Sequence, residues 1–289
     1  MLSFRTITKS DIPIIREYTS RCNIQSCDFT LCGIYLWGAY YRYELCEYAN
    51  TLFIKGVDES ESEAFAFPIG EMEPSEAVAI VLDYCNKRGI SPRFSFVPRT
   101  ALPYFNGANA AILYGWSDYI YDAESLKTLS GKKLHKKKNR LNKFIKTYEN
   151  HSFLPVNNQN IQSLRDFYNR FLAENPPDNK RLVAEAQIIQ RIFDEFDLLK
   201  LSAGVLTVDG EIIAFAIGEL VGDTLYIHFE KALREYDGAF EAVNSFFVRE
   251  FAQNATFVDR EEDMGDLGLR QAKTAYCPIK MVDKFEVGY

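Results

Sequence analysis

Three polar side chains alternate along a predicted strand, Thr224–Lys231. Alternate side chains of a strand point to the same face, so we expect Tyr226, His228 and Glu230 to share one face. A histidine or glutamate in a cleft can be tuned to accept a proton, which makes His228 and Glu230 candidate catalytic residues. The alternative is a half-buried strand with a hydrogen-bonded His228 and a surface pair of Glu230 with Lys231.

A second set of charged side chains lies in the run 259–273. Asp266, Arg270 and Lys273 stand at i, i+4 and i+7, a spacing that predicts one face of a helix. Arg270 and Lys273 are candidates to bind an acidic or phosphate group, and Asp263 is a candidate general base. The alternative is an exposed, salt-bridged helix. Two glycines in this run instead favour a tightly shaped backbone.

A loop and a predicted helix, Phe240–Gln253, follow the strand Thr224–Lys231. The first N–H groups of a helix have no partner within the helix, and its positive end attracts anions. The sequence therefore predicts that this loop binds the phosphates of a donor or an activated carbonyl. The candidate donor-binding residues are Tyr236, Asp237, Gly238, Ala239 and Phe240.

A basic segment, Lys132–Lys146, stands out in a chain whose formal net charge is −7. Its apolar residues fall at helical spacing, which predicts an amphipathic helix over 132–148. Concentrated positive charge binds phosphates through counterion release, whereas the alternative is a solvated helix face. The candidate substrate-binding residues here are Lys132, Lys133, Lys137 and Lys138.

The elements that must position these residues follow the same order twice. In the second half, two helices precede a three-stranded meander, and a helix and a strand follow it. We predict the helices at Ile161–Glu174 and Ala184–Phe196, the meander at Leu201–Val208, Ile212–Leu220 and Thr224–Lys231, and the last strand at Thr256–Asp259. In the first half we predict helices at Ser10–Ser20 and Pro74–Arg88 and strands at Thr51–Lys55, Ala64–Ile69 and Arg93–Val97, with 29–43 as helix or loop.

Bulk properties fit a two-domain protein. The chain has 289 residues, of which 47% are hydrophobic, enough for two domains of ordinary size. No stretch approaches the roughly 20 apolar residues of a membrane span, and the N-terminus lacks the apolar core of a signal peptide. These features predict a cytoplasmic protein without a transmembrane segment. The six cysteines lack paired zinc-ligand spacing, so we expect free thiols and no metal site.

Several of these motifs together resemble a known family. The run Glu262-Asp263-Met264-Gly265 with Gly268-Leu269-Arg270 and Lys273 is similar to the C-terminal domain family of phosphatidylglycerol lysyltransferases. Further similarity comes from 229–232, 236–238, 131–133 and 138–142, so that the resemblance covers roughly 119–285. Those proteins consist of two fused GNAT-like acyltransferase domains and are also similar to the Fem peptidyltransferases.

The resemblance implies an α+β fold of two GNAT-like domains, 1–118 and 119–289, each a mainly antiparallel sheet flanked by helices. It also implies transfer of an acyl or aminoacyl group from acyl-CoA or aminoacyl-tRNA, with no tightly bound cofactor. The acceptor would be an amine or hydroxyl of a small molecule, lipid or peptide. The chain lacks the membrane portion of the lysyltransferases and the glycine pattern of the CoA-binding loop. A catalytically inactive RNA-binding or regulatory module, and a scaffold without a ligand, are the alternatives.

Overall fold

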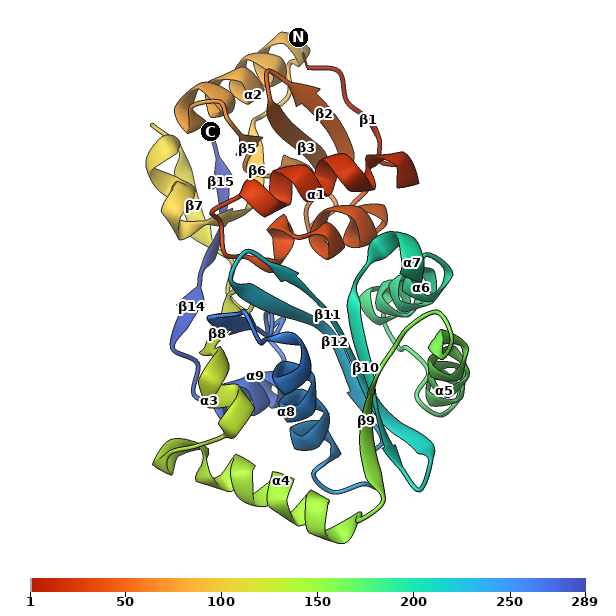
Figure 1. The fold of residues 1–289 in the computed structure, drawn as a ribbon. Coiled ribbons are helices and arrows are strands. Elements are labelled where there is room, and N and C mark those ends of the chain that lie inside the picture. The colour runs from red at the N-terminus through yellow and green to blue at the C-terminus, as the bar shows by residue number, and fades with distance from the viewer. Residues whose placement is uncertain (1) are drawn as a thin grey trace. The chain divides into compact units, whose positions relative to one another are not determined.

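A computed structural model describes residues 2–289, and the chain divides into two compact units (Figure 1). Unit 1 contains 1–118, 262–266 and 281–289, and unit 2 contains 119–261 and 267–280. The predicted second domain, 119–289, differs from unit 2 because the last strand, β15 (Lys284–Gly288), pairs with strands of unit 1.

Unit 1 is built on a mixed sheet with the strand order β1-β2-β3-β4-β6-β15-β7, in which β5 also pairs with β3. Most neighbours are antiparallel, and β4 and β6 are parallel. The strands are β1 (Arg5–Thr6), β2 (Glu44–Tyr48), β3 (Thr51–Val57), β4 (Glu63–Phe65), β5 (Ile69–Gly70), β6 (Arg93–Pro98) and β7 (Asn109–Ile112).

The two helices predicted in the first half are present, but α1 (Ile12–Arg21) begins after Asp11 and not at the predicted Ser10, which lies in a short 3-10 turn. Pro13 occupies the first turn of α1, where no intrahelical N–H bond is lost. Helix α2 (Pro74–Arg88) begins with a proline and ends at Gly89, whose φ of 66° suits a residue without a Cβ. Between α1 and β2 the chain forms short 3-10 and π turns over 27–39.

Unit 2 contains a second mixed sheet, with the order β14-β8-β13-β12-β11-β10-β9. Its centre is the predicted meander, which consists of β10 (Ser202–Val208), β11 (Glu211–Val221) and β12 (Thr224–Ala232). The other strands are β8 (Asp118–Asp122), β9 (His151–Pro155), β13 (Phe257–Asp259) and β14 (Lys280–Val282).

Helices cover both faces of this second sheet. Helix α8 (Ala239–Phe251) packs its apolar side chains on one face, with α3 (Ala123–Thr128) and α4 (His135–Thr147) beside it (Figure 1). On the other face, Phe167 and Tyr168 of α5 (Ile161–Glu174) pack against the ring of Phe215. The remaining helices are α6 (Lys180–Asp194), α7 (Phe196–Leu199) and α9 (Leu267–Thr274).

The predicted repeat of element order is confirmed. In each unit antiparallel strands lead into a helix, and the strand after that helix runs parallel to an earlier strand of the same sheet. In unit 1, β6 follows α2 and pairs with β4; in unit 2, β13 follows α8 and pairs with β12. The α+β class with two sheets flanked by helices is confirmed as well. The segment 29–43 lies outside the regular helices, and the neighbouring strand β2 was not predicted.

All six cysteines are free thiols, and four of them are buried. Among residues 2–289, no helix has both the length and the apolar character that a membrane crossing requires.

Candidate active site at the fork of two strands

Strands β12 and β13 form a fork in the sheet of unit 2. They pair in parallel over three positions only, of which Tyr226 with Asp259 is the last. Just past that point β12 contains a bulge, because Ile217 of β11 pairs with Phe229 and the next residue, Gly218, pairs with Ile227. His228 is therefore an extra residue at the fork. Bulges often redirect side chains beside functional sites.

The bulge overturns the prediction that Tyr226, His228 and Glu230 share one face. Ile227 and Ala232 both join the core beneath α8, although strict alternation would place them on opposite faces. Glu230 lies on the α8 side, where the amide of Asn244 donates to it. The rings of Tyr226 and His228 remain neighbours. The sequence pattern failed here because a bulge shifts the alternation by one residue.

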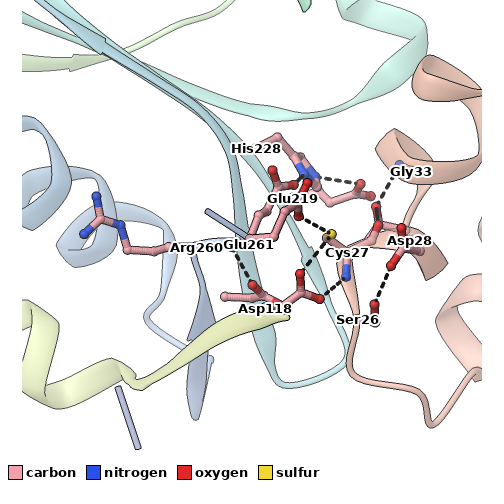
Figure 2. A network of polar contacts seen from close by, with 12 residues as sticks. Ser26, Cys27, Asp28, Gly33, Asp118, Glu219, His228, Arg260 and Glu261 are labelled. Atoms are coloured by element: carbon pink, nitrogen blue, oxygen red, sulfur yellow. Dashed lines mark hydrogen bonds and ion pairs between the residues drawn. The ribbon is translucent and has the colours of Figure 1, made fainter. Parts of the chain in front are cut away.

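His228 lies between two glutamates. Its Nδ1 is 2.7 Å from Oε1 of Glu261, and its Nε2 is 3.0 Å from Oε1 of Glu219 (Figure 2). The imidazole is buried, as is Glu219, whereas the Glu261 side chain keeps 19% of its exposure. A neutral imidazole has only one N–H, so both contacts are satisfied only by an imidazolium or by a protonated carboxyl group. His228 thus fixes two carboxylates and has no free nitrogen in this arrangement.

Glu261 is held in a strained backbone conformation. Its φ is 57°, in the left-handed region that a residue with a Cβ seldom adopts. The N–H of Glu261 donates to Oδ1 of Asp259 at 2.7 Å, and Asp259 is fully buried. Strain of this kind concentrates at functional sites, where the surrounding structure imposes it. Glu261 is the more accessible carboxylate at the fork.

A second polar cluster lies beneath α8. Nη2 of Arg260 is 3.1 Å from one carboxylate oxygen of Glu230, and the Asn244 amide is 2.9 Å from the other. The guanidinium of Arg260 also packs over the ring of Tyr276. Burial, the largest single effect, lowers the pKa of Arg260, but the nearby charges, with Glu230 first among them, together outweigh it and the pKa is raised. Figure 2 shows Arg260 pointing away from His228 and its glutamates.

Both oxygens of Glu230, a candidate base, are therefore engaged in this second cluster. The cluster also holds two buried polar atoms, Nη1 of Arg260 and Oδ1 of Asn244, for which residues 2–289 provide no hydrogen-bond partner. Such atoms are rare in folded proteins and indicate that water or a ligand completes the site.

The candidate donor loop and the basic helix meet in unit 2. Gly238 caps α8 with a φ of 88°, and a Cβ there would lie 2.9 Å from the backbone oxygen of Arg140 in α4. Arg140 and Lys143 donate to Asp237 at 2.9 and 2.8 Å. Hydrogen bonds from Lys143 and Arg140 hold the pKa of Asp237 below its ordinary value. Carboxylates of unit 2 therefore already lie at the positive end of α8.

Helix α4 uses part of its basic surface internally. Lys137 donates to the buried Glu241 in the first turn of α8 at 2.9 Å, and its ammonium lies over the ring of Tyr276. The predicted apolar stripe of this helix faces the core: Leu134 and Leu141 are buried, and Ile145 and Tyr148 are partly buried against the core. Phe144, which was not predicted, is buried with them. Six lysines of the basic segment are exposed: Lys132, Lys133, Lys136, Lys138, Lys143 and Lys146. Of these, Lys143 is bonded to Asp237.

The motif around Asp263 is a shaped turn, as its glycines predicted. Met264 and Gly265 have φ angles of 51° and 79°, and the N–H of Gly265 donates to Oδ1 of Asp263 at 2.8 Å. The prediction that Asp266 lies on a helix face is wrong, because α9 begins at Leu267. The structure places Asp263 and Asp266 in unit 1.

The two basic candidates of this motif lie in α9, in unit 2. Arg270 is exposed. Nζ of Lys273 is 2.5 Å from the backbone oxygen of Arg260, so Lys273 contributes to the position of the Arg260 segment.

Unit 1 contains a buried cluster of charged residues around Lys284. Nζ of Lys284 is 2.7 Å from Asp28, 2.8 Å from Asp118 and 3.8 Å from Glu262. The Cys27 thiol lies 3.2 Å from the same ammonium. The Cys27 N–H donates to Asp118 (Figure 2). Cys27, Asp118 and Glu262 have the spacing of metal ligands, but Lys284 already supplies the cation among them. Burial raises the pKa of Asp118 to about 7.

Several residues of these clusters were not predicted. Glu261 lies in the charged run that was singled out, but five consecutive charged residues give no indication of which one reaches the fork. Glu219 was placed only as a strand residue. The pairing of Lys284 with residues more than 150 positions away along the chain leaves no local pattern.

The sequence and the fold were compared with known proteins. The family model "Phosphatidylglycerol lysyltransferase, C-terminal" matches 20–287. A conserved protein of unknown function from Bacteroides thetaiotaomicron has a TM-score of 0.93 at 26% identity, over 100% of this chain and 99% of that one. The structure of L-PGS from Bacillus licheniformis gives 0.68 at 14% identity, over 98% and 92%. FemX gives 0.62 at 9% identity, over 99% and 97%.

A curated relative, an uncharacterised protein of Mycoplasmoides gallisepticum, is 28% identical over 174 residues, 59% of this chain and 56% of that protein. The chain thus aligns with little more than half the length of this relative. At 14% and 9% identity, L-PGS and FemX show a similar fold only. The family model, in contrast, matches nearly the whole sequence. The resemblance inferred from the sequence motifs is confirmed: the chain belongs to the phosphatidylglycerol lysyltransferase C-terminal family.

Proposed function

We propose that unit 2 transfers an aminoacyl group from aminoacyl-tRNA to a hydroxyl or amine of a lipid or peptide acceptor, with the reaction at the fork of β12 and β13. The observation that carries this proposal is the position of Glu261 and Glu219 on either side of His228 at that fork. The family name specifies a lysyl group, which is cationic. Two carboxylates held by one imidazole suit the ammonium of such a group.

The fork offers a place for the reacting carbonyl. The ladder between β12 and β13 ends at Tyr226, so the following edge of β12 has no neighbouring strand on that side among the described residues. A backbone N–H on such an edge can donate to the ester carbonyl and stabilise the negative charge that develops on its oxygen. The acceptor oxygen or nitrogen forms the new bond to the carbonyl carbon, and the bond to the tRNA 3′-oxygen breaks.

Glu261 is the group that we assign to proton transfer. Its carboxylate accepts the proton of the attacking acceptor, and the proton is then delivered to the departing oxygen of the tRNA. Glu230 instead positions Arg260 and Asn244, because both of its oxygens are engaged. Asp263 accepts a hydrogen bond from the N–H of Gly265 in a turn, so we prefer Glu261 over Asp263 as the general base.

The charges around α8 favour tRNA over coenzyme A as the donor. Asp237 and Glu241 already lie at the N-terminal end of this helix, and Gly238 is pressed against the backbone of α4. Additional phosphates at this end would have to compete with these two carboxylates for Lys137, Arg140 and Lys143. The exposed lysines of α4 form a basic surface that suits the phosphate backbone of an RNA.

A transfer assay tests the proposal. Lysyl-tRNA and other aminoacyl-tRNAs labelled in the amino acid are incubated with the protein and phosphatidylglycerol vesicles, and label in the lipid is measured. Glu261→Gln should lower transfer about a hundredfold, because it removes the proton acceptor and keeps the shape. Glu124→Gln, which changes an exposed glutamate of α3, is the matched control. Unchanged transfer in Glu261→Gln contradicts the assignment, and tRNA binding without transfer for any donor or acceptor supports a binding module instead.

A further inference from the structure

Unit 1 contains a pocket of about 440 Å³, a volume that suits a small organic molecule. The C-terminal end of α1, the turn between β2 and β3, and the loop before α2 surround it. Phe67 and Ile69, both buried, provide an apolar floor. Gly70 brings the loop close to Asn50, because a Cβ at Gly70 would lie 2.3 Å from the Asn50 backbone oxygen.

Carboxylates dominate the rim of this pocket. Glu17, Glu47 and Glu71 line it together with a single cation, Arg21, which lies 3.1 Å from Glu17 and 4.0 Å from Glu71. The Tyr18 hydroxyl donates to Glu47 at 2.9 Å. Burial first, and Glu47 next, raise the pKa of Tyr18. The last turn of α1 faces the same space and adds the negative end of its dipole.

The repeated element order allows the start of α2 in unit 1 to be compared with the start of α8 in unit 2. The segment between β4 and α2 in unit 1, which includes β5, corresponds to the loop between β12 and α8 in unit 2. In unit 1 the helix begins with Pro74, which has no N–H, and Glu73 caps the N–H of Glu76 with its own side chain at 3.0 Å. This helix start is therefore a poor site for phosphate.

We propose that the pocket of unit 1 binds a small organic cation, an amine with an apolar body, and excludes phosphate-bearing ligands. The ammonium would lie among Glu17, Glu47 and Glu71, and the apolar part would cover Phe67 and Ile69. This site involves no residue of the β12–β13 fork, and the inference does not depend on the proposed transfer reaction.

Three probes of similar size and different charge test this inference. Binding of 2-phenylethylamine, 2-phenylethanol and phenyl phosphate to the full chain is measured by ligand-detected NMR at low and high salt. The amine should bind most tightly, and added salt should weaken it, because the rim carboxylates are solvent-exposed and screened. Equal binding of the alcohol and the amine, or tighter binding of the phosphate, would overturn the proposal.

Variants locate the site. Replacing Glu47 and Glu71 together by glutamine should weaken amine binding about fivefold or more, since each exposed ion pair contributes modestly. Ile24→Trp places a larger side chain in the pocket without changing its charge, so it should abolish amine binding. This second variant tests the site independently if the double glutamine variant folds poorly. Glu149→Gln, an exposed glutamate of unit 2, is the control, and Glu261→Gln should leave amine binding unchanged whatever it does to transfer. Undiminished amine binding in Ile24→Trp would place the amine elsewhere and refute the site.

Discussion

The ammonium of Lys284 lies 2.8 Å from Oδ1 of Asp118, and neither side chain is more than 1% exposed. Asp28 and Glu262 contact the same ammonium, so one cation faces three carboxylates inside unit 1. Charges removed from water in this way are stable only while they remain paired. The chain leaves unit 1 directly after Asp118 and enters it again at Glu262. The cluster therefore joins segments of unit 1 that are distant in sequence.

Lys284→Met should destabilise the protein strongly. Removing one partner leaves buried carboxylates without their cation, and the loss of a buried pair costs about 3–5 kcal/mol. The free energy of unfolding is measured by chemical denaturation at pH 8. Lys87→Met removes an exposed pair with Asp83 and should cost less than about 1 kcal/mol. Equal effects of the two substitutions would contradict the importance of the buried cluster.

Asp118 should make stability depend on pH in the acidic range. Its pKa is about 7 in the folded chain, against 3.8 ordinarily, because of burial. Between these values the folded state binds the extra proton, so stability falls as pH rises from about 4 to 7, by at most about 1.4 kcal/mol per pH unit, and levels off above. Lys284, Asp28 and Glu262 face this carboxyl group and shift the midpoint, and the Cys27 thiol also contacts it.

Asp118→Asn tests the origin of that slope. The amide oxygen can still accept from the N–H of Cys27, but the group no longer titrates. Unfolding free energies measured between pH 4 and 8 should then lose the decline. Persistence of the same decline in the variant would assign it to other groups.

Gly238→Ala should loosen the contact of α4 with α8. The φ of 88° is unfavourable for alanine, and the new Cβ would press on the backbone oxygen of Arg140 and on Phe144. Strain and overpacking together should cost roughly 2–3 kcal/mol of unfolding free energy. Gly210→Ala meets the same strain at a φ of 85° but has open space around it, so it should cost only about 1 kcal/mol. Equal losses in the two variants would show that α4 does not constrain Gly238.

The sequence predicted regular elements and charge patterns better than it predicted contacts. The meander and the helix Pro74–Arg88 follow from hydrophobic spacing and from Gly89, which are local properties. The bulge at His228 has no such signal, because it depends on how β11 and β12 pair along their whole length. The position of Lys284 among carboxylates likewise depends on β15 returning to the first sheet. Short, charged strands of this kind carry little hydrophobic periodicity.

The exposed lysines of α4 should set the salt dependence of tRNA binding. Lys133 and Lys136 are exposed, whereas Lys137, Arg140 and Lys143 are tied to Glu241 and Asp237. If each exposed lysine contacts one phosphate, replacing Lys133 and Lys136 by glutamate should reduce the slope of log affinity against log salt by about 2. Affinity is measured by filter binding or fluorescence anisotropy at several salt concentrations.

A control variant separates local contact from overall charge. Lys9→Glu with Lys87→Glu changes the net charge equally, but both positions are exposed in unit 1, outside the basic helix. This control should lower the affinity slightly and keep the slope, because long-range repulsion is screened beyond roughly 10 Å at 0.1 M salt. If both double variants change the slope alike, the basic surface of α4 does not bind the RNA. An unmeasurable affinity of the unmodified chain for tRNA at low salt would remove the support that this helix gives to an aminoacyl-tRNA donor.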